Sequence, residues 1–198
     1  MRKALGVCGL LLLGTLSAAA QNGYKNMFGG EYDQLRVRER DSSSGRVTHF
    51  HLNGFQLHYT RFVIGQWLGL EGMFQYDHGT PFGVSTNYEL GGGGIRLRYP
   101  GQRWQPWVRA NIGVGHISFK ETGVSSGHEF FGQYIGTTQI NSNRLSDTGF
   151  AGKFGGGLDI GLTPHVSLKL IEVNYVPTRL FGETQHNFGW NSGIHLWF

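Results

Sequence analysis

Apolar and polar residues alternate with a period of two along most of the chain after residue 21, and no stretch there keeps a helical period. The alternation runs for about ten residues at a time, which is the length of a strand that crosses a bilayer. The pattern predicts strands over these segments: 27–36, 49–59, 67–76, 94–99, 107–115, 150–162, 166–175 and 188–198. We therefore expect an all-β fold built from eight strands.

The segment 150–162 shows the alternation most clearly. One face carries Phe150, Phe154, Leu158, Ile160 and Leu162, and the other carries Lys153, Gly155, Gly157, Asp159 and Gly161. The segment 166–175 is the exception, because neither of its faces is uniform. A β-bulge that reverses the facing is one explanation, although the alternation does not locate it.

The connections between these segments alternate in length. The short ones are 60–66, 100–106 and 163–165, and the long polar ones are 37–48, 77–87, 116–149 and 176–187. Short turns at one end and long loops at the other are typical of a bacterial outer-membrane barrel, and an even strand number puts both termini at the short-turn end. The pattern predicts an eight-stranded antiparallel up-and-down transmembrane β-barrel with periplasmic termini.

Composition separates this fold from a soluble barrel of lipocalin type, which alternates in the same way. Glycine supplies 33 of 198 residues, aromatic residues 14% and charged residues only 15%. A sheet face in water carries many charges, whereas the polar faces here hold glycine and isolated charges. A narrow lumen filled by a few long charged side chains would need such glycines, so we expect the apolar faces to contact lipid.

Aromatic residues near the ends of the predicted strands would then form the two interfacial girdles. One girdle would hold Tyr59, Phe62, Tyr99, Trp104, Trp107, Trp197 and Phe198, and the other Tyr76, Phe119, Phe150, Tyr175 and Trp190. Ordinary core packing is the alternative interpretation of these rings.

The first twenty residues are typical of a secretory signal peptide. Arg2 and Lys3 precede the apolar run 4–16, and Ala18 to Ala20 form a small-residue cleavage site. We expect residues 1–20 to be removed and residues 21–198 to form the barrel. Cys8 lies in the signal, so the exported part has no disulfide framework. The formal net charge of +4 includes Arg2 and Lys3, and no basic cluster suggests a nucleic-acid partner.

The chain ends on an alternating strand whose last residue is aromatic. Ile194, Leu196 and Phe198 supply its alternating apolar positions. This terminus, together with the signal peptide and the loop asymmetry, resembles the OmpA-type family of eight-stranded outer-membrane barrels. The resemblance covers residues 22–198 and implies an assembly signal, read by the barrel assembly machinery, at the three apolar positions. It does not reach the periplasmic peptidoglycan-binding domain of full-length OmpA proteins, so that activity is not expected.

Charged residues on the inward face are the best-defined candidate site. They are Glu31, Glu71, Arg96, Arg98, Arg109, Lys153 and Asp159, with Lys169 and Glu172 on the strand of mixed facing. Isolated charges in a narrow lumen are costly unless they pair. We expect a salt-bridged network that closes the lumen, and the alternative is a narrow gated pore or ligand conduit, since OmpA-like barrels carry a comparable network that can act as a gate.

Other constellations support weaker hypotheses. His49 and His51 share a strand face, but no cysteine or carboxylate pair accompanies them, so no metal or cofactor is expected. A lipid-modifying enzyme would need a pair such as His78 with Ser85, or His128 with Ser125 and Ser126, yet no recognisable motif surrounds either. We therefore do not expect the protein to be an enzyme.

The expected role is structural or surface-interactive. The protein would be a monomer in outer-membrane lipid and lipopolysaccharide, and loop 116–149 would contact an extracellular partner that the sequence does not name.

Overall fold

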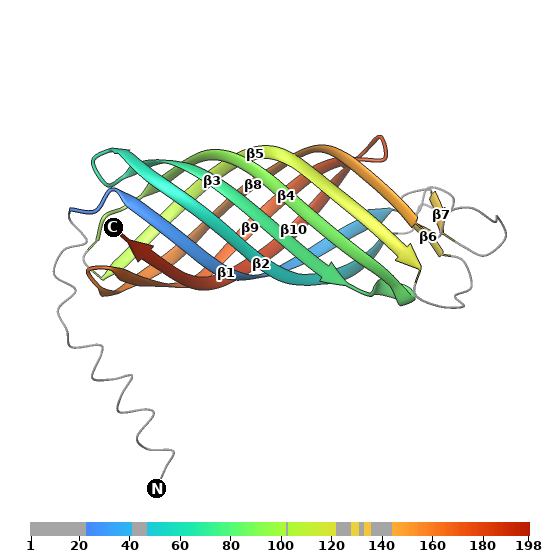
Figure 1. The fold of residues 1–198 in the computed structure, drawn as a ribbon, viewed down its shortest axis with the longest axis horizontal. Coiled ribbons are helices and arrows are strands. Elements are labelled where there is room, and N and C mark those ends of the chain that lie inside the picture. The colour runs from blue at the N-terminus through green and yellow to red at the C-terminus, as the bar shows by residue number, and fades with distance from the viewer. Residues whose placement is uncertain (1–22, 41–46, 102, 122–127, 131–132, 136–143) are drawn as a thin grey trace, which may run out of the picture.

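Eight long antiparallel strands close into one barrel in the computed structural model, which describes residues 23–40, 47–101, 103–121, 128–130, 133–135 and 144–198 (Figure 1). The strands are β1 (Asn26–Arg40), β2 (Val47–Ile64), β3 (Leu68–Gly79), β4 (Val84–Arg98), β5 (Trp104–Glu121), β8 (Arg144–Thr163), β9 (Val166–Leu180) and β10 (Glu183–Trp197). Each strand pairs with its neighbours in sequence, and β1 pairs with β10 to close the ring. The expected fold class is confirmed.

Three short elements of secondary structure lie at one end of the described barrel. A 3-10 turn, η1 (Pro81–Gly83), joins β3 to β4, and β6 (His128–Phe130) pairs with β7 (Gln133–Ile135) between β5 and β8. The C-terminus lies at the opposite end, beside the start of β1 (Figure 1). No helix in the described part of the chain is long and apolar enough to cross a membrane. The expected signal peptide, 1–20, lies outside the described residues.

The strands are longer than the sequence pattern predicted, so most of the expected long loops are wrong. Strand covers all of 77–87 except residues 80–83, and all of 176–187 except residues 181–182. The two-residue turn has positive φ at both Phe181 (53°) and Gly182 (78°), which suits the twist of a tight hairpin. Segments 37–48 and 116–149 are likewise strand at both of their ends.

Several of the missed strand segments have an inverted alternation. In the part of the barrel nearest to the C-terminus, apolar side chains face outward and polar side chains face inward. Toward the other end, β1 turns Leu35 and Val37 inward and Arg36 and Arg38 outward. The same inversion occurs in β2, β4, β5 and β9. With Met73 of β3 and Ala151 of β8, the inward apolar residues form one cluster: Leu35, Val37, Phe50, Leu52, Met73, Val84, Tyr88, Leu90, Ile117, Phe119, Ala151, Val176 and Leu180.

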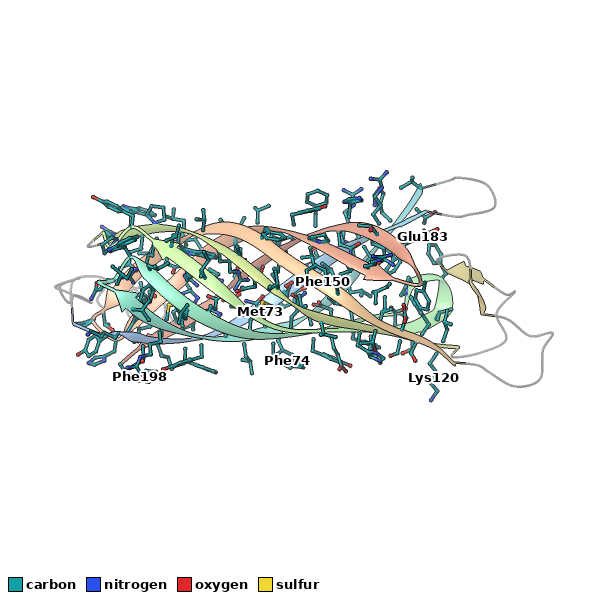
Figure 2. The ribbon with its side chains drawn as sticks, turned by 90° about the horizontal axis from the view of Figure 1, so that it is seen from above. Met73, Phe74, Lys120, Phe150, Glu183 and Phe198 are labelled. Carbon is teal, nitrogen blue, oxygen red and sulfur yellow. The ribbon has the colours of Figure 1, made fainter. Side chains whose placement is uncertain are left out.

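The inversion marks a change of the medium around the barrel. Large apolar side chains such as Phe74, Phe150 and Phe198 project outward over one part of the wall, while Met73 points inward (Figure 2). Such a wall suits hydrocarbon, and closure leaves no strand edge unpaired there. Where the wall becomes polar and the interior apolar, the strands continue as a water-facing barrel does. The lipocalin-type arrangement, with apolar residues inside and polar residues outside, is therefore found only at the inverted end.

The irregular facing of β9 results from a β-bulge at Leu170. Leu158 of β8 pairs with Ile171, and the next residue, Asp159, pairs with Lys169, so Leu170 has no partner of its own. Both Leu170 and Ile171 face outward. The bulge thereby brings Lys169 and Glu172 to the same inner face.

The expected aromatic girdles are wrong in part. Phe62, Trp107, Phe119 and Trp197 are buried inside the barrel. Tyr59, Tyr99, Trp104 and Phe198 are exposed near the C-terminal end of the barrel, as is Trp67, which the sequence pattern did not single out. The four buried rings fill lumen space because they share the inward parity of their strands, which proximity to a strand end does not reveal.

Inward glycines give the lumen side chains room. A Cβ built on Gly29 would lie 2.1 Å from Cε1 of His58 and 2.8 Å from Cδ2 of His195, and one built on Gly157 would lie 2.6 Å from Trp107. The outward Gly72 has nothing within 4 Å of that position. At Gly29 the neighbouring side chains require glycine, and at Gly157 a Cβ would also meet the backbone oxygen of Ile171, at 2.6 Å.

We expect Gly29→Ala to lower the free energy of unfolding by about 1–3 kcal/mol, the usual cost of overpacking. Urea titration of the folded, heat-modifiable form on a gel would measure it. Gly72→Ala is the matched control, since its methyl group enters open space. Equal stability of the two variants would contradict a steric role for Gly29.

Candidate functional site

The lumen is filled by three layers of side chains. The layer nearest the C-terminus is a small apolar cluster of Met27, Phe62 and Trp197. The rings of Phe62 and Trp197 stack at 5.6 Å, and the guanidinium of Arg98 lies 4.2 Å from the Trp197 ring centroid. A charged layer follows, and the apolar cluster of the inverted segments forms the third layer. The layers together occupy the length of the barrel.

Glu31 of β1 is a centre of the charged layer. Its Oε1 lies 2.5 Å from Lys169 Nζ, 2.9 Å from His58 Nδ1 and 3.3 Å from His195 Nε2. Its Oε2 accepts a hydrogen bond from Gln56 Nε2 at 3.1 Å. These partners come from β2, β9 and β10, so one carboxylate links strands on both sides of β1.

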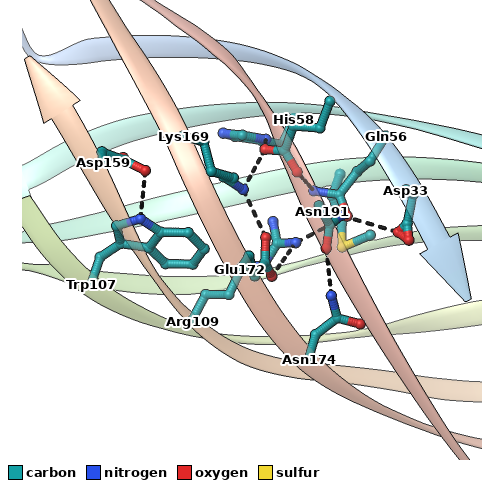
Figure 3. A network of polar contacts seen from close by, with 12 residues as sticks. Asp33, Gln56, His58, Trp107, Arg109, Asp159, Lys169, Glu172, Asn174 and Asn191 are labelled. Atoms are coloured by element: carbon teal, nitrogen blue, oxygen red, sulfur yellow. Dashed lines mark hydrogen bonds and ion pairs between the residues drawn. The ribbon is translucent and has the colours of Figure 1, made fainter.

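Glu172 of β9 extends this group of ion pairs across the barrel (Figure 3). Lys169 Nζ lies 2.7 Å from Glu172 Oε2, and Arg109 Nη2 lies 2.6 Å from Glu172 Oε1. Arg109 also pairs with Glu71 of β3 at 3.2 Å, where Asn111 donates a further hydrogen bond at 2.7 Å. The bulge at Leu170 is what lets Lys169 and Glu172 meet, three residues apart on one face.

Asp159 of β8 organises the layer near Trp107. Arg96 Nη2 lies 2.9 Å from its Oδ2, Trp107 Nε1 donates to its Oδ1 at 2.8 Å, and His195 Nδ1 lies 3.0 Å from Oδ2. The guanidinium of Arg96 also stacks 3.8 Å from the Trp107 ring centroid. A carboxylate buried in this way is stabilised by charge-assisted hydrogen bonds on both oxygens.

Lys153 of β8 anchors the side of the network toward the apolar cluster. Its Nζ lies 3.3 Å from Asp33 Oδ2 and donates to Gln56 Oε1 at 2.6 Å and Gln75 Oε1 at 2.7 Å. Asn191 of β10 donates to the same carboxylate at 3.0 Å.

The structure brings the predicted charged residues together inside the barrel. The buried positions include Glu31, Glu71, Arg96, Arg98, Arg109, Lys153, Asp159, Lys169 and Glu172. Arg98 stands apart from the rest, since it donates to Gln105 and Gln66 at 3.2 Å. Ile194, Leu196 and Phe198 project outward from the last strand, and the Phe198 backbone pairs with Asn26 at 3.0 Å.

Sequence reasoning missed several members of the network, including Asp33, His58, His195 and Trp107. Strand parity could have found three of them, because Asp33 shares the parity of Glu31, His58 that of Gln56, and His195 that of Gly193. Trp107 has the parity of Arg109, but its aromatic character suggested the interface instead. The acidic and basic side chains of this layer come from all eight strands of the ring. The network therefore forms only when every strand is in the correct register.

One group in the layer has the composition of a metal site. A carboxylate oxygen of Glu31 and one ring nitrogen each of His58 and His195 lie within 4.8 Å of one another. Lys169 Nζ, however, is already 2.5 Å from Glu31. An ammonium ion thus occupies the place next to the carboxylate that a metal ion would need, and the arrangement favours an ion-pair network. His49 and His51 face outward, away from this group.

Solved structures share the fold of this chain. The chain is similar to Ail, the attachment invasion locus protein of Yersinia pestis, with 19% identity and a TM-score of 0.56, covering 88% of this chain and 99% of Ail. It is also similar to neisserial surface protein A, with 12% identity and a TM-score of 0.61, covering 86% of this chain and 97% of that protein. No protein-family model and no curated protein matches. At these identities the likeness shows the fold, that of an eight-stranded outer-membrane β-barrel.

We expect Arg96→Ala to lower the free energy of unfolding by about 3–5 kcal/mol, because it leaves Asp159 and Glu71 buried with fewer cations. Urea titration with the gel-shift readout would measure the loss. Arg61→Ala is the control, since Arg61 is exposed on the outer wall of β2. An unchanged urea midpoint for Arg96→Ala would contradict a stabilising network.

Proposed function

We propose that this protein is an outer-membrane barrel that carries no solute and acts at its extracellular end, in a structural or surface-interaction role. The observation that carries the proposal is the filled lumen. The Met27, Phe62 and Trp197 cluster, the charged layer and the larger apolar cluster leave the ends and the outer wall as the surfaces that can meet a partner. The gated-pore alternative would require buried ion pairs such as Glu31–Lys169 to separate inside the barrel.

The asymmetry of the two ends supports an orientation with both termini in the periplasm. Short turns at 65–67, 99–103 and 164–165 lie at the end where β1 starts and β10 finishes. The other end has the short connections 80–83 and 181–182 and also the 22-residue connection 122–143, on which the asymmetry rests. Bacterial outer-membrane barrels place their short turns in the periplasm. In this orientation the terminal strand, with Ile194, Leu196 and Phe198, would face the barrel assembly machinery during insertion.

The connection between β5 and β8 is the proposed contact with an extracellular partner. Ail has also been solved in complex with the heparin analogue sucrose octasulfate, which supports a sulfated glycan as the first partner to test here. The barrel would act as a monomer, because its outward apolar wall suits lipid and the carboxylates of the lumen find their cationic partners within one chain.

The proposed role involves no catalysis. His78, a candidate for an enzymatic pair with Ser85, has its Nδ1 2.7 Å from Asn87 Oδ1. The other candidate pair includes Ser125 and Ser126, which lie outside the described residues.

We expect bacteria that display the protein to bind a heparin-coated surface, and to lose that binding when residues 122–143 are replaced by a short Gly-Ser turn. Attached cells would be counted, and heat-modifiability would show that the barrel is folded. Replacing residues 80–83 in the same way is the control for any change at that end. Binding that survives the loss of 122–143 would contradict the proposed contact.

We expect no stepwise conductance from the purified protein in a planar bilayer, because the lumen is filled along its length. Detergent without protein is the control. A steady open channel would contradict the closed barrel and favour the pore.

A further inference from the structure

A basic hollow lies on the outer wall of the barrel, on β1, β2 and β10. It has a volume of about 370 Å³ and is lined by Arg36, Arg38, Val47, His49, His186 and Phe188. None of these residues belongs to the buried network, and none of them is acidic. The hollow therefore gathers positive charges on the outer surface that take no part in the ion-pair network of the lumen.

Strand register assembles the hollow. Arg38 of β1 pairs with His49 of β2, and Arg36 pairs with Phe188 of β10 on its other side. Paired residues on one face of a sheet have side chains about 5 Å apart. The two arginines thus stand in the middle, with a histidine from β2 and an aromatic ring from β10 on either side.

Among the side chains that the structure describes, which do not include Glu39, the arginines of the hollow have no acidic partner. The ion pairs between described side chains are all inside the lumen. Two guanidinium groups on one face, with the ring of His49 beside them, create a positive local potential that suits an anion.

The height of the hollow on the wall indicates which anion. Below Arg36 on the same face lie Gln34 and the ring of Tyr32, and Trp190 of β10 donates to Gln34 Oε1 at 2.7 Å. Tyr32 and Trp190 contact each other at 5.8 Å between ring centroids. Aromatic rings with polar tips mark the membrane interface, so the arginines stand at the level of the lipid headgroups.

We propose that this hollow binds the phosphate group of a phosphorylated glycolipid in the outer leaflet. Arg36 and Arg38 bind the phosphate, since guanidinium groups match phosphate oxygens in geometry and charge. Phe188 contacts the sugar above, and the wall of Tyr32 and Trp190 contacts the acyl chains below. The inference rests on the orientation proposed above, which places this end of the barrel in the outer leaflet.

The test is a titration of the purified, folded protein in detergent with bisphosphorylated lipid A. We expect the double variant Arg36→Gln, Arg38→Gln to bind more weakly by about fivefold for each arginine removed. The double variant Lys120→Gln, Arg179→Gln is the matched control, since it removes two outward charges at the same end that do not line the hollow; its affinity should stay near that of the native protein. The substituted side chains are exposed, and heat-modifiability confirms that all variants are folded.

Further arms identify the ligand chemistry. Lipid A from which both phosphates have been removed should lose the dependence on Arg36 and Arg38, and inorganic phosphate alone should compete only weakly because it lacks the acyl and sugar contacts. Bound lipid A should raise the pKa of His49, measured by NMR, since a nearby anion favours the protonated ring.

The proposal is overturned if both double variants weaken lipid A binding equally, if dephosphorylated lipid A binds as well as the phosphorylated form, or if soluble heparin binds through Arg36 and Arg38 while lipid A does not. Failure here would leave attachment through residues 122–143 unaffected, whereas failure of attachment alone would leave the lipid site standing. The two proposals can therefore fail separately.

Discussion

The buried group of ion pairs that runs from Glu31 through Lys169 and Glu172 to Arg109 is the interaction on which the barrel depends. A closed ring of eight strands offers side chains only two places, the lumen and the outer wall. Charges that would be costly in hydrocarbon are confined to the lumen, where no bulk water solvates them. They are stable there because each carboxylate of the group has a cation or an amide as partner. The same contacts join strands that are far apart in the sequence.

Room for this network comes from residues that have no side chain. Gly29, Gly157 and Gly193 stand where a Cβ would meet His58, Trp107 or Glu31. Long side chains can therefore cross a narrow lumen without distorting the strands. The abundance of glycine and the scarcity of charge are two consequences of one geometry.

Charge is used differently on the two surfaces of the barrel. Inside, Arg96 and Arg109 each pair with two buried carboxylates, so they stabilise the fold and offer little to a ligand. Outside, Arg36 and Arg38 stand above an aromatic band without an acidic partner among the described side chains. Because the lumen is filled, a ligand can bind only at the outer surface or the ends of the barrel. Arg36 and Arg38 at the membrane interface are the part of that surface best suited to an anion.

The period-two alternation determined the fold class and the inward charges, because facing in a strand is a local property: Glu71, Arg96 and Asp159 could be assigned from parity alone. Strand parity also places His58 and Asp33 on the inward face, although they were not included among the predicted network residues. The segments 77–87 and 176–187 were predicted as loops because they are largely polar. Only the closed barrel shows that the strands continue through most of them, where the medium outside changes from lipid to water.

What the sequence could not decide depends on contacts between strands. The bulge at Leu170 is defined by the register of β9 against β8, so the facing of Lys169 and Glu172 became definite only when the strands were paired. Parity already places Trp107 inside the barrel, but its partners come from two other strands: Asp159 accepts from its ring nitrogen and Arg96 stacks on its face. The hollow at Arg36 and Arg38 likewise needs residues from β10, about 150 positions later, brought beside β1 by closure of the ring. Alternation along one strand determines which side a residue faces, but its partners are set by the strands beside it.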